Sequence, residues 1–203
     1  MSEYIKRYLK EVETIAQNID KEKVESIIKD VISVKKNSGR IFFLGVGGSA
    51  ANCSHAVNDF RKIAEIDSYT PLDNVAELTA RTNDEGWDSV FADWLIRSNL
   101  NINDLIFILS VGGGSKEKKI STNLISAIDY AKKVNSKVVG IVGRDGGYTA
   151  ANTNSCIIIP KISDDTITPH AESWQAVIWH LIVTDPRIQS FKNKWENIEE
   201  KKI

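Results

Sequence analysis

The sequence predicts an α/β domain whose central parallel sheet is covered by helices on both faces. Short apolar runs, several of them ending in glycine, alternate along the chain with longer segments in which apolar residues recur at helical spacing. A strand that is apolar at every position is buried on both faces, which is typical of parallel sheets. Because strands and helices alternate, the helices are expected to connect neighbouring strands and to cover the sheet. No Pro- or Gly-rich linker divides the 203 residues, so a single domain is expected.

Residues 1–37 are expected to form helices ahead of the first strand. Residues 3–37 are nearly free of glycine and proline, and apolar residues recur there in two groups, from Ile5 to Ile19 and from Val24 to Ile32. This spacing predicts two amphipathic helices. Their apolar faces could pack on the sheet of the same chain or on another subunit.

The rest of the chain is expected to contain a sandwich core, residues 38–185, and a charged C-terminal tail, residues 186–203. Strands are predicted over residues 40–44, 104–109, 137–142 and 155–159, and helices over residues 50–63, 123–134 and 171–183. The end of the tail, residues 192–203, is expected to be a frayed, exposed helix. Parallel sheets of this kind bind ligands at the carboxyl ends of their strands.

Composition narrows the function classes. The formal net charge of -1 gives no general attraction to nucleic acid or to an anionic membrane, so neither is expected as a partner. No apolar run approaches the roughly 20 residues that cross a bilayer, and the N-terminus lacks the apolar region of a signal peptide. The two cysteines, Cys53 and Cys156, do not form a paired motif. Free thiols are typical of a reducing compartment, so a cytoplasmic location is expected.

Two predicted strands end in loops of small residues, Gly45–Ser49 and Ser110–Ser115. Glycine lets the backbone approach an anion, the helix that follows presents free N–H groups, and serine adds hydroxyl donors. One such loop could be only a tight turn, but two in one sheet favour a phosphomonoester site. Neither loop has a dinucleotide or Walker A pattern. The expected phosphate-binding residues are Gly47, Gly48, Ser49, Ser110, Gly112, Gly113 and Ser115.

Two imidazoles and two carboxylates stand at helical spacing on predicted helices. His55 and Asp59 are four residues apart and share a face, and Glu172 and His180 are two turns apart. Each residue alone could be structural: the histidines hydrogen-bonded or in the core, Asp59 in a surface ion pair, Glu172 near a helix N-terminus. Together they have the ligand types for zinc or a similar divalent metal.

Five motifs, taken in order, resemble one family. They are Gly47–Ser49 followed by His55, the segment Thr82–Trp87, the loop Ser110–Ser115, the turn Val142–Gly147, and the pair Glu172 and His180. On these motifs the chain resembles the SIS (sugar isomerase) domain family over residues 35–185, and within it the phosphoheptose isomerases.

The resemblance implies a flavodoxin-like three-layer αβα sandwich and a homotetramer with sites between subunits. It implies interconversion of sedoheptulose 7-phosphate and a D-glycero-D-heptose 7-phosphate, as in heptose biosynthesis for surface glycans. It further implies that Ser49, Ser110 and Ser115 bind phosphate and that Asn83 and Asp84 belong to the substrate site. A zinc ion is implied on the residues that match the family's ligands: His55, Asp59, Glu172 and His180.

The sequence also departs from the family pattern. Val111 and Gly112 stand where the family has Thr and Ser, so two hydroxyl donors are missing. Backbone N–H groups or one of Lys116, Lys118 and Lys119 could replace them. Arg81 and Arg144 could also neutralise a phosphate, although loop arginines are mostly solvated. Asp59 replaces a family Glu, and Glu172 replaces a family Gln.

Aldose–ketose isomerisation moves a proton between adjacent carbons and needs an acid, a base and a way to stabilise an enediolate. We expect Asp59 or Glu172 to act as the base and His180 as its acid/base partner, with a metal able to polarise the substrate oxygens. The alternatives are a non-catalytic sugar-phosphate-binding regulator and an isomerase of another phosphosugar. The acid/base groups favour an enzyme, because a regulator has no need for them.

Overall fold

The computed structural model describes residues 2–192 and 194 and contains one sheet of five parallel strands. Its order is β2-β1-β3-β4-β5, the order of flavodoxin-like sheets. The strands are β1 (Ile41–Leu44), β2 (Ser68–Tyr69), β3 (Leu105–Ser110), β4 (Lys137–Val142) and β5 (Ser155–Ile158). The predicted α/β class and parallel sheet are confirmed.

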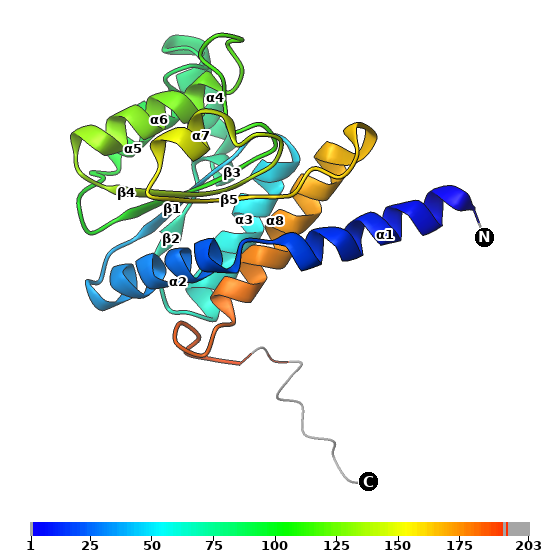
Figure 1. Cartoon of the computed structure of the whole chain (residues 1–203). Coiled ribbons are helices and arrows are strands. Elements are labelled where there is room, and N and C mark those ends of the chain that lie inside the picture. The colour runs from blue at the N-terminus through cyan, green and yellow to red at the C-terminus, as the bar shows by residue number, and fades with distance from the viewer. Residues whose placement is uncertain (1, 193, 195–203) are drawn as a thin grey trace, which may run out of the picture.

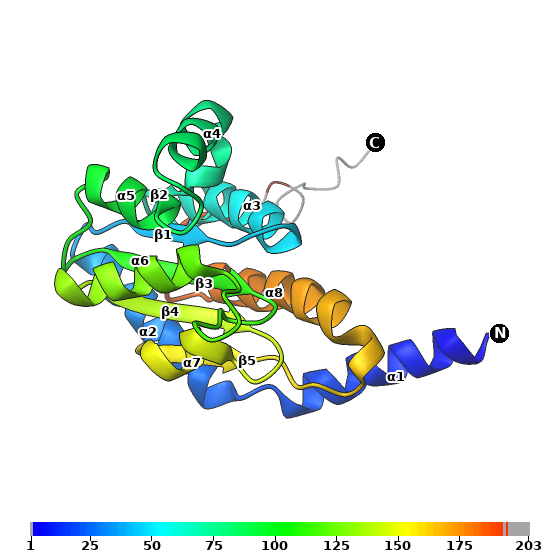
Figure 2. The same ribbon diagram turned by 90° about the horizontal axis from the view of Figure 1, so that it is seen from above.

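Helices cover both faces of the sheet, so the architecture is the expected three-layer sandwich (Figures 1 and 2). One layer contains α2 (Lys21–Lys36), α3 (Gly48–Lys62) and α8 (Ile167–Val183). The opposite layer contains α5 (Val90–Arg97), α6 (Thr122–Lys133) and α7 (Gly147–Asn152), with α4 (Val75–Asp84) at its edge. No helix of the described chain is long and apolar enough to cross a bilayer.

Alternate residues of each strand face opposite layers, as the pleat requires. Phe43 of β1 packs on the α3 side, where its ring stacks on that of Phe107 at 5.1 Å and meets the edge of Phe60 at 5.2 Å. Its neighbour Phe42 faces the α5 and α6 side and contacts the edge of Trp94 at 5.5 Å. The continuous apolar run of β1 is therefore needed on both faces, which explains why it lacks polar alternation.

The predicted elements are confirmed to within a few residues at their ends. Four further elements were not predicted: β2, which has only two residues, and the helices α4, α5 and α7. The α4 helix buries none of its residues, so it has no apolar stripe to detect. Both α5 and α7 have eight residues or fewer, too short for a helical period to be distinguished from a loop.

The strand order changes direction between β1 and β3. The chain leaves β1 towards β2 on one side and later returns to pair β3 on the other side of β1. This topological switch point leaves a crevice at the carboxyl ends of the two strands, where open α/β sheets bind ligands. The two glycine-rich loops, Gly45–Ser49 after β1 and Ser110–Ser115 after β3, flank it.

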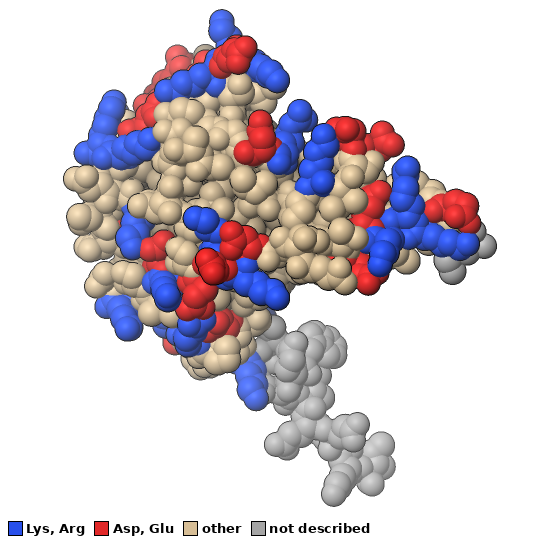
Figure 3. Space-filling model, viewed as in Figure 1, with Lys and Arg blue, Asp and Glu red and all other residues tan. Residues whose placement is uncertain are grey.

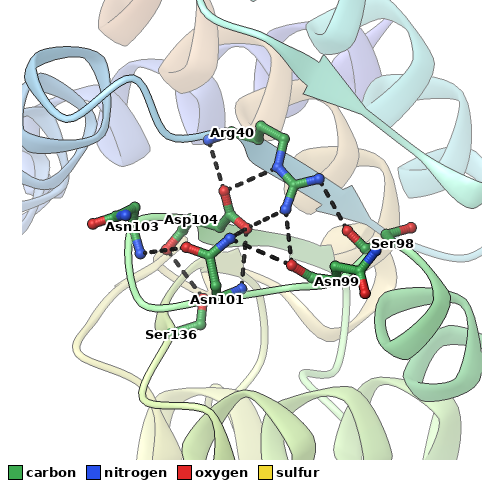
Figure 4. A network of polar contacts seen from close by, with 7 residues as sticks. All are labelled: Arg40, Ser98, Asn99, Asn101, Asn103, Asp104 and Ser136. Carbon is green, nitrogen blue, oxygen red and sulfur yellow. Dashed lines mark hydrogen bonds and ion pairs between the residues drawn. The ribbon is translucent and has the colours of Figure 1, made fainter.

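At the opposite, amino-terminal ends of the strands, the Asp104 side chain links the start of β1 to the start of β3 (Figure 4). Its buried carboxylate accepts hydrogen bonds from the backbone N–H of Arg40 at 2.9 Å and from two guanidinium nitrogens at 3.1 and 2.6 Å. It also accepts from Asn101, and Arg40 donates to the carbonyl oxygens of Ser98 and Asn99. These bonds raise the pKa of the guanidinium. One ion pair thus joins the starts of β1 and β3 next to their first register pair, Ile41 and Leu105.

The first helix, α1 (Glu3–Asn18), extends away from the body for much of its length (Figure 1). Its inner end is held by Glu11, whose buried carboxylate accepts a hydrogen bond from Thr166 at 2.7 Å and contacts the His170 ring at 2.9 Å. The Thr166 bond, followed by the His170 contact, lowers the pKa of Glu11 below its usual range. Glu11 therefore links α1 to the start of α8.

The described part of the predicted tail packs on the domain rather than leaving it. Ile188 is buried, and Arg187 pairs with Glu25 of α2 at 2.8 Å. The backbone N–H of Ser190 donates to the carbonyl of Ile63 at the end of α3. The frayed helix expected over residues 192–203 lies almost wholly outside the described residues.

Replacing Asp104 by Asn is expected to lower the free energy of unfolding by about 2–4 kcal/mol, because it removes one member of a largely buried, hydrogen-bonded ion pair. Urea denaturation monitored by circular dichroism would measure the change. The control is Glu13→Gln, which breaks an exposed pair with Lys10 and should change stability by less than about 1 kcal/mol. Equal effects of the two substitutions would contradict the role given to Asp104.

Candidate functional site

The structure brings three of the predicted metal ligands, on α3 and α8, together. One Asp59 carboxylate oxygen lies 3.7 Å from His55 Nε2 and 3.6 Å from His180 Nε2. The three ligand atoms lie within 4.8 Å of one another. Both imidazoles are about half exposed, whereas the Asp59 side chain is 14% exposed. The cluster therefore opens to solvent on its imidazole side.

Neighbouring groups hold both histidine rings. His180 Nδ1 lies 2.7 Å from the carbonyl oxygen of Ala176, one turn earlier on α8. A carbonyl only accepts, so Nδ1 carries a proton, and Nε2 faces Asp59. The buried Trp179 ring stacks on His180 with centroids 3.5 Å apart and meets the edge of His55 at 4.8 Å. The two Nε2 atoms are thus aimed at the same carboxylate.

The donor set fits a divalent metal. Two imidazole nitrogens and one carboxylate oxygen are the three-ligand set of catalytic zinc sites, which keep a fourth position for water or substrate. The carbonyl behind His180 is the kind of outer contact that fixes the tautomer of a ligating histidine. His55, Asp59 and His180 could therefore hold the ion that the sequence implies.

Glu172, the fourth predicted ligand, lies elsewhere in the structure. It stands two turns before His180, and its carboxylate contacts Gly48 at the N-terminus of α3. A Cβ atom added to Gly48 would lie only 2.5 Å from Glu172 Oε2. The structure therefore places this carboxylate at the positive end of the α3 dipole and not within the His55, Asp59 and His180 cluster.

In the first predicted phosphate loop, the Ser49 side chain is engaged with the interior, whereas Gly47 and Gly48 are exposed. Ser49 is buried, and its hydroxyl accepts a hydrogen bond from Gln175 Nε2 at 3.0 Å. Gln175 in turn accepts from Asn52, which also donates to the carbonyl of Glu172. This polar chain joins α3 to α8. Gly47, Gly48 and Ser49 do not line the pocket formed by the second loop, although Val46 does.

The second loop, by contrast, lines a cavity of about 670 Å³ at the carboxyl ends of β1, β3 and β4. The lining combines hydroxyl groups, cations and backbone. Its members are Val46, Ser110, Val111, Gly112, Gly114, Ser115, Lys116, Glu117, Lys118, Ile120, Ser121, Arg144, Asp145, Gly147 and Tyr148. Three of the predicted loop residues, Ser110, Gly112 and Ser115, are therefore exposed to one cavity.

Backbone packs directly on backbone where this loop meets the turn after β4. A Cβ atom on Gly113 would lie 2.0 Å from the carbonyl oxygen of Gly146, and one on Gly147 would lie 2.3 Å from that of Gly112. Thr149 binds the carbonyl of Gly113 through both its N–H and its hydroxyl, at 2.9 and 2.8 Å. Gly113 and Gly147 are thus required by close approach, and the cavity has a rigid wall at this contact.

Donors in the second loop remain available. Within the described chain, the N–H groups of Gly112 and Gly114 make no hydrogen bond. The hydroxyls of Ser110 and Ser115 accept bonds from Gly113 and Lys118, which leaves their own protons free to donate. An anion in the cavity could therefore be bound by amides and hydroxyls together.

The three lysines proposed as replacements for the missing hydroxyls differ in their surroundings. Lys116 Nζ lies 3.1 Å from Asp129 and 4.6 Å from the centre of the Tyr148 ring. Lys118 lines the cavity, and Lys119 does not. The Asp129 carboxylate also accepts a hydrogen bond from the Tyr148 hydroxyl at 2.5 Å, and this bond raises the pKa of Tyr148. The charge of Lys116 is therefore already balanced.

Other predicted residues lie away from the cavity lining. Asn83 and Asp84 are exposed at the end of α4 and hydrogen-bond to each other at 2.8 Å. Arg81 pairs with Glu77 on the same helix and with Glu85, which caps its C-terminus. Arg144, in contrast, lines the cavity, as does Tyr148, for which the sequence carried no distinguishing signal. Its place follows only from the packing of α7 against the second loop.

The chain matches known proteins over most of its length. The family model described as SIS domain matches residues 3–143. A phosphoheptose isomerase of Aliarcobacter butzleri is 31% identical over 89% of this chain and 94% of its own length. One from Aneurinibacillus thermoaerophilus is 27% identical over 98% of this chain and 100% of its own. The solved phosphoheptose isomerase of Neisseria gonorrhoeae superposes with a TM-score of 0.76 at 23% identity, covering 89% of this chain and 92% of that one.

Gly113→Ala is expected to destabilise the protein by about 3 kcal/mol or more, because its φ of +68° is left-handed and its Cβ would strike the Gly146 backbone. Its neighbour provides the control. An added Cβ at Gly112 would make only an ordinary 3.6 Å contact with Arg144, so Gly112→Ala should stay within about 1 kcal/mol of wild type. Thermal unfolding of both variants would test the assignment, which fails if Gly113→Ala is as stable as Gly112→Ala.

Proposed function

The chain belongs to the SIS domain family, and we propose that it is a phosphoheptose isomerase interconverting sedoheptulose 7-phosphate and a D-glycero-D-heptose 7-phosphate. The observation that carries the proposal is the cluster of Asp59 with two imidazole Nε2 atoms at 3.6 and 3.7 Å. Proton transfer between adjacent carbons needs such a set of acid and base groups. A protein that only binds a sugar phosphate does not.

The second loop is proposed to bind the substrate phosphate. The free N–H groups of Gly112 and Gly114, with the Ser110 and Ser115 hydroxyls, line the cavity at the switch point of the sheet. Ser49 would contribute only if its hydroxyl keeps Gln175 as a partner while donating to the phosphate. Asn83 and Asp84 are proposed to contact the sugar. Neither residue lines the cavity of its own chain, so this contact requires that α4 approach a substrate site from which it is separated here.

Asp59 and Glu172 remain the two proposed bases, with His180 as acid/base partner. Asp59 is already within reach of the His180 imidazole, so a proton taken from one substrate carbon could pass to the neighbouring oxygen within this group. Glu172 faces the α3 N-terminus, whose dipole favours its ionised form. The closer association with His180 makes Asp59 the preferred base when no metal occupies the cluster, whereas Glu172 is the free carboxylate when Asp59 and His180 bind a metal.

A divalent metal, with zinc preferred, is proposed to be held by His55, Asp59 and His180. When bound, it would polarise the carbonyl and hydroxyl oxygens of the substrate. Glu172 could complete the set only if its carboxylate leaves Gly48. The chain itself supplies the preorganisation, because Ala176 and Trp179 already orient the His180 ring.

We propose a homotetramer with sites between subunits, because the phosphate cavity and the proposed metal and acid/base residues are separate within one chain. The cavity lining contains none of His55, Asp59, Glu172 and His180. Apolar side chains are also exposed on α1 and α8: Tyr4, Ile5, Leu9, Val177 and Leu181. An uncharged stretch of surface is visible where α1 leaves the body (Figure 3). A second copy seated there could bring one chain's cavity to another's cluster.

A cytoplasmic location is proposed from the thiols. Cys53 and Cys156 are unpaired, as expected in a reducing compartment. Burial raises the pKa of Cys53 well above its usual value and that of Cys156 to about 12. Both side chains are therefore protonated and unreactive near neutral pH.

Asp59→Asn is expected to reduce kcat on sedoheptulose 7-phosphate by about 100-fold or more, the usual cost of losing a general base. Formation of the aldose would be followed by NMR. Glu172→Gln tests the second base, and Glu22→Gln, on the exposed surface of α2, is the control. Full turnover by both Asp59→Asn and Glu172→Gln would refute the base assignment. A wild-type protein that binds the ketose without converting it would favour the regulator.

His180→Ala is expected to weaken zinc binding by about 10-fold or more, because it removes an oriented ligand. Titration of the metal-free protein with Zn²⁺ by calorimetry would measure the affinity for zinc. Quenching of Trp179 fluorescence by Co²⁺ would show that the metal binds next to Trp179, which contacts both histidine rings. Trp179→Phe is the control for the fluorescence signal. Unchanged zinc affinity in His180→Ala would exclude this cluster as the metal site.

A further inference from the structure

Arg144 occupies a fixed and unusual position at the cavity. It follows β4 in the turn that packs against the second loop, and its backbone φ is +54°, in the left-handed region. The preceding residue, Gly143, donates its N–H to the Val111 carbonyl at 3.0 Å, and Gly146 donates to the Gly143 carbonyl at 3.0 Å. A non-glycine residue held at positive φ costs free energy and is often found at functional sites.

The Arg144 side chain lies against the second loop. A Cβ atom added to Gly112 would lie 3.6 Å from Arg144 Cδ, an ordinary contact distance. The stem of the arginine therefore passes beside Gly112, which lines the same cavity and whose N–H makes no hydrogen bond within the described chain.

Among the cations that line the cavity, Arg144 is uncommitted. Lys116 is paired with Asp129 at 3.1 Å. The Arg144 guanidinium makes no hydrogen bond or ion pair with any described residue, although Asp145 stands beside it in sequence. The Asp145 carboxylate instead accepts a bond from the Gly147 N–H at 3.2 Å. Lys118 is also unpaired among the described residues, but its ammonium is a single point charge on a flexible stem and cannot form the two parallel bonds that a guanidinium makes with a phosphate.

We propose that Arg144 binds the phosphate of the substrate. A guanidinium can donate two parallel hydrogen bonds to a phosphate, with full positive charge at every accessible pH. The amides of Gly112 and Gly114 would bind the same group from the loop side. The inference rests on the proposed function only for the identity of the sugar, since any phosphomonoester dianion fits this chemistry.

The experiment compares Arg144→Gln, Arg144→Lys and Arg144→Gly with Arg97→Gln, an exposed arginine at the end of α5 outside the cavity. Binding of inorganic phosphate is measured by calorimetry, and KM and kcat are measured with sedoheptulose 7-phosphate. Arg144→Gln should raise both the phosphate Kd and the KM by about 10-fold or more, as the loss of a charge-assisted bond predicts, with kcat changed less than about threefold. Arg144→Lys should recover part of the affinity, and Arg97→Gln should behave as wild type.

Arg144→Gly separates binding from folding. Glycine accepts the positive φ without strain, so this variant should unfold at a temperature no lower than wild type while losing phosphate affinity as Arg144→Gln does. Unchanged phosphate Kd and KM in Arg144→Gln would overturn the inference and leave the isomerase proposal intact. Arginine-dependent phosphate binding without turnover of the heptose would instead support Arg144 and overturn the isomerase proposal.

Discussion

The ion pair between Arg40 and Asp104 fixes the geometry on which the site depends. It joins the starts of β1 and β3, and those two strands are only four and six residues long. Because the two strands are joined there, the loops that leave their other ends are held at a defined separation across the switch point. The pair is stabilised by several backbone and side-chain partners around a single buried carboxylate, which is the arrangement in which such a charge is tolerated.

Much of this fold could be predicted from residue pattern alone. The strands β1, β3 and β4 could be predicted because they are buried on both faces and are therefore apolar without alternation, as the opposite directions of Phe42 and Phe43 illustrate. The longer helices could be predicted because their apolar stripes extend over several turns. What could not be predicted were elements without such a stripe, α4 above all, and the strand β2, whose pairing depends on where β1 already lies. Their existence is a consequence of tertiary packing.

The candidate site was predictable in part, for a physical reason. His55 and Asp59 share a helix face by spacing, so their proximity follows from sequence, and α8 adds His180 because it packs along α3. Glu172 has the right spacing to His180 but lies two turns away along α8. At that height the neighbouring helix α3 presents its N-terminus, at Gly48, and not the ligands His55 and Asp59. Periodicity specifies which face a residue occupies; the height at which two helices meet is decided by packing. The packing of α8 on α3 likewise decides that Ser49 faces inward, where Gln175 of α8 donates to its hydroxyl.

The close backbone contact between Gly113 and Gly146 bears on how the cavity can diversify. A position whose every side chain would strike a carbonyl cannot accept mutations, however useful their chemistry. The freedom to evolve a new ligand preference is thereby left to side chains that border the rigid wall without forming it, among them those at 111, 112 and 144. A library randomised at these three sites would explore sugar-phosphate selectivity at little risk to folding, whereas one spread over the glycines would mostly yield unfolded chains.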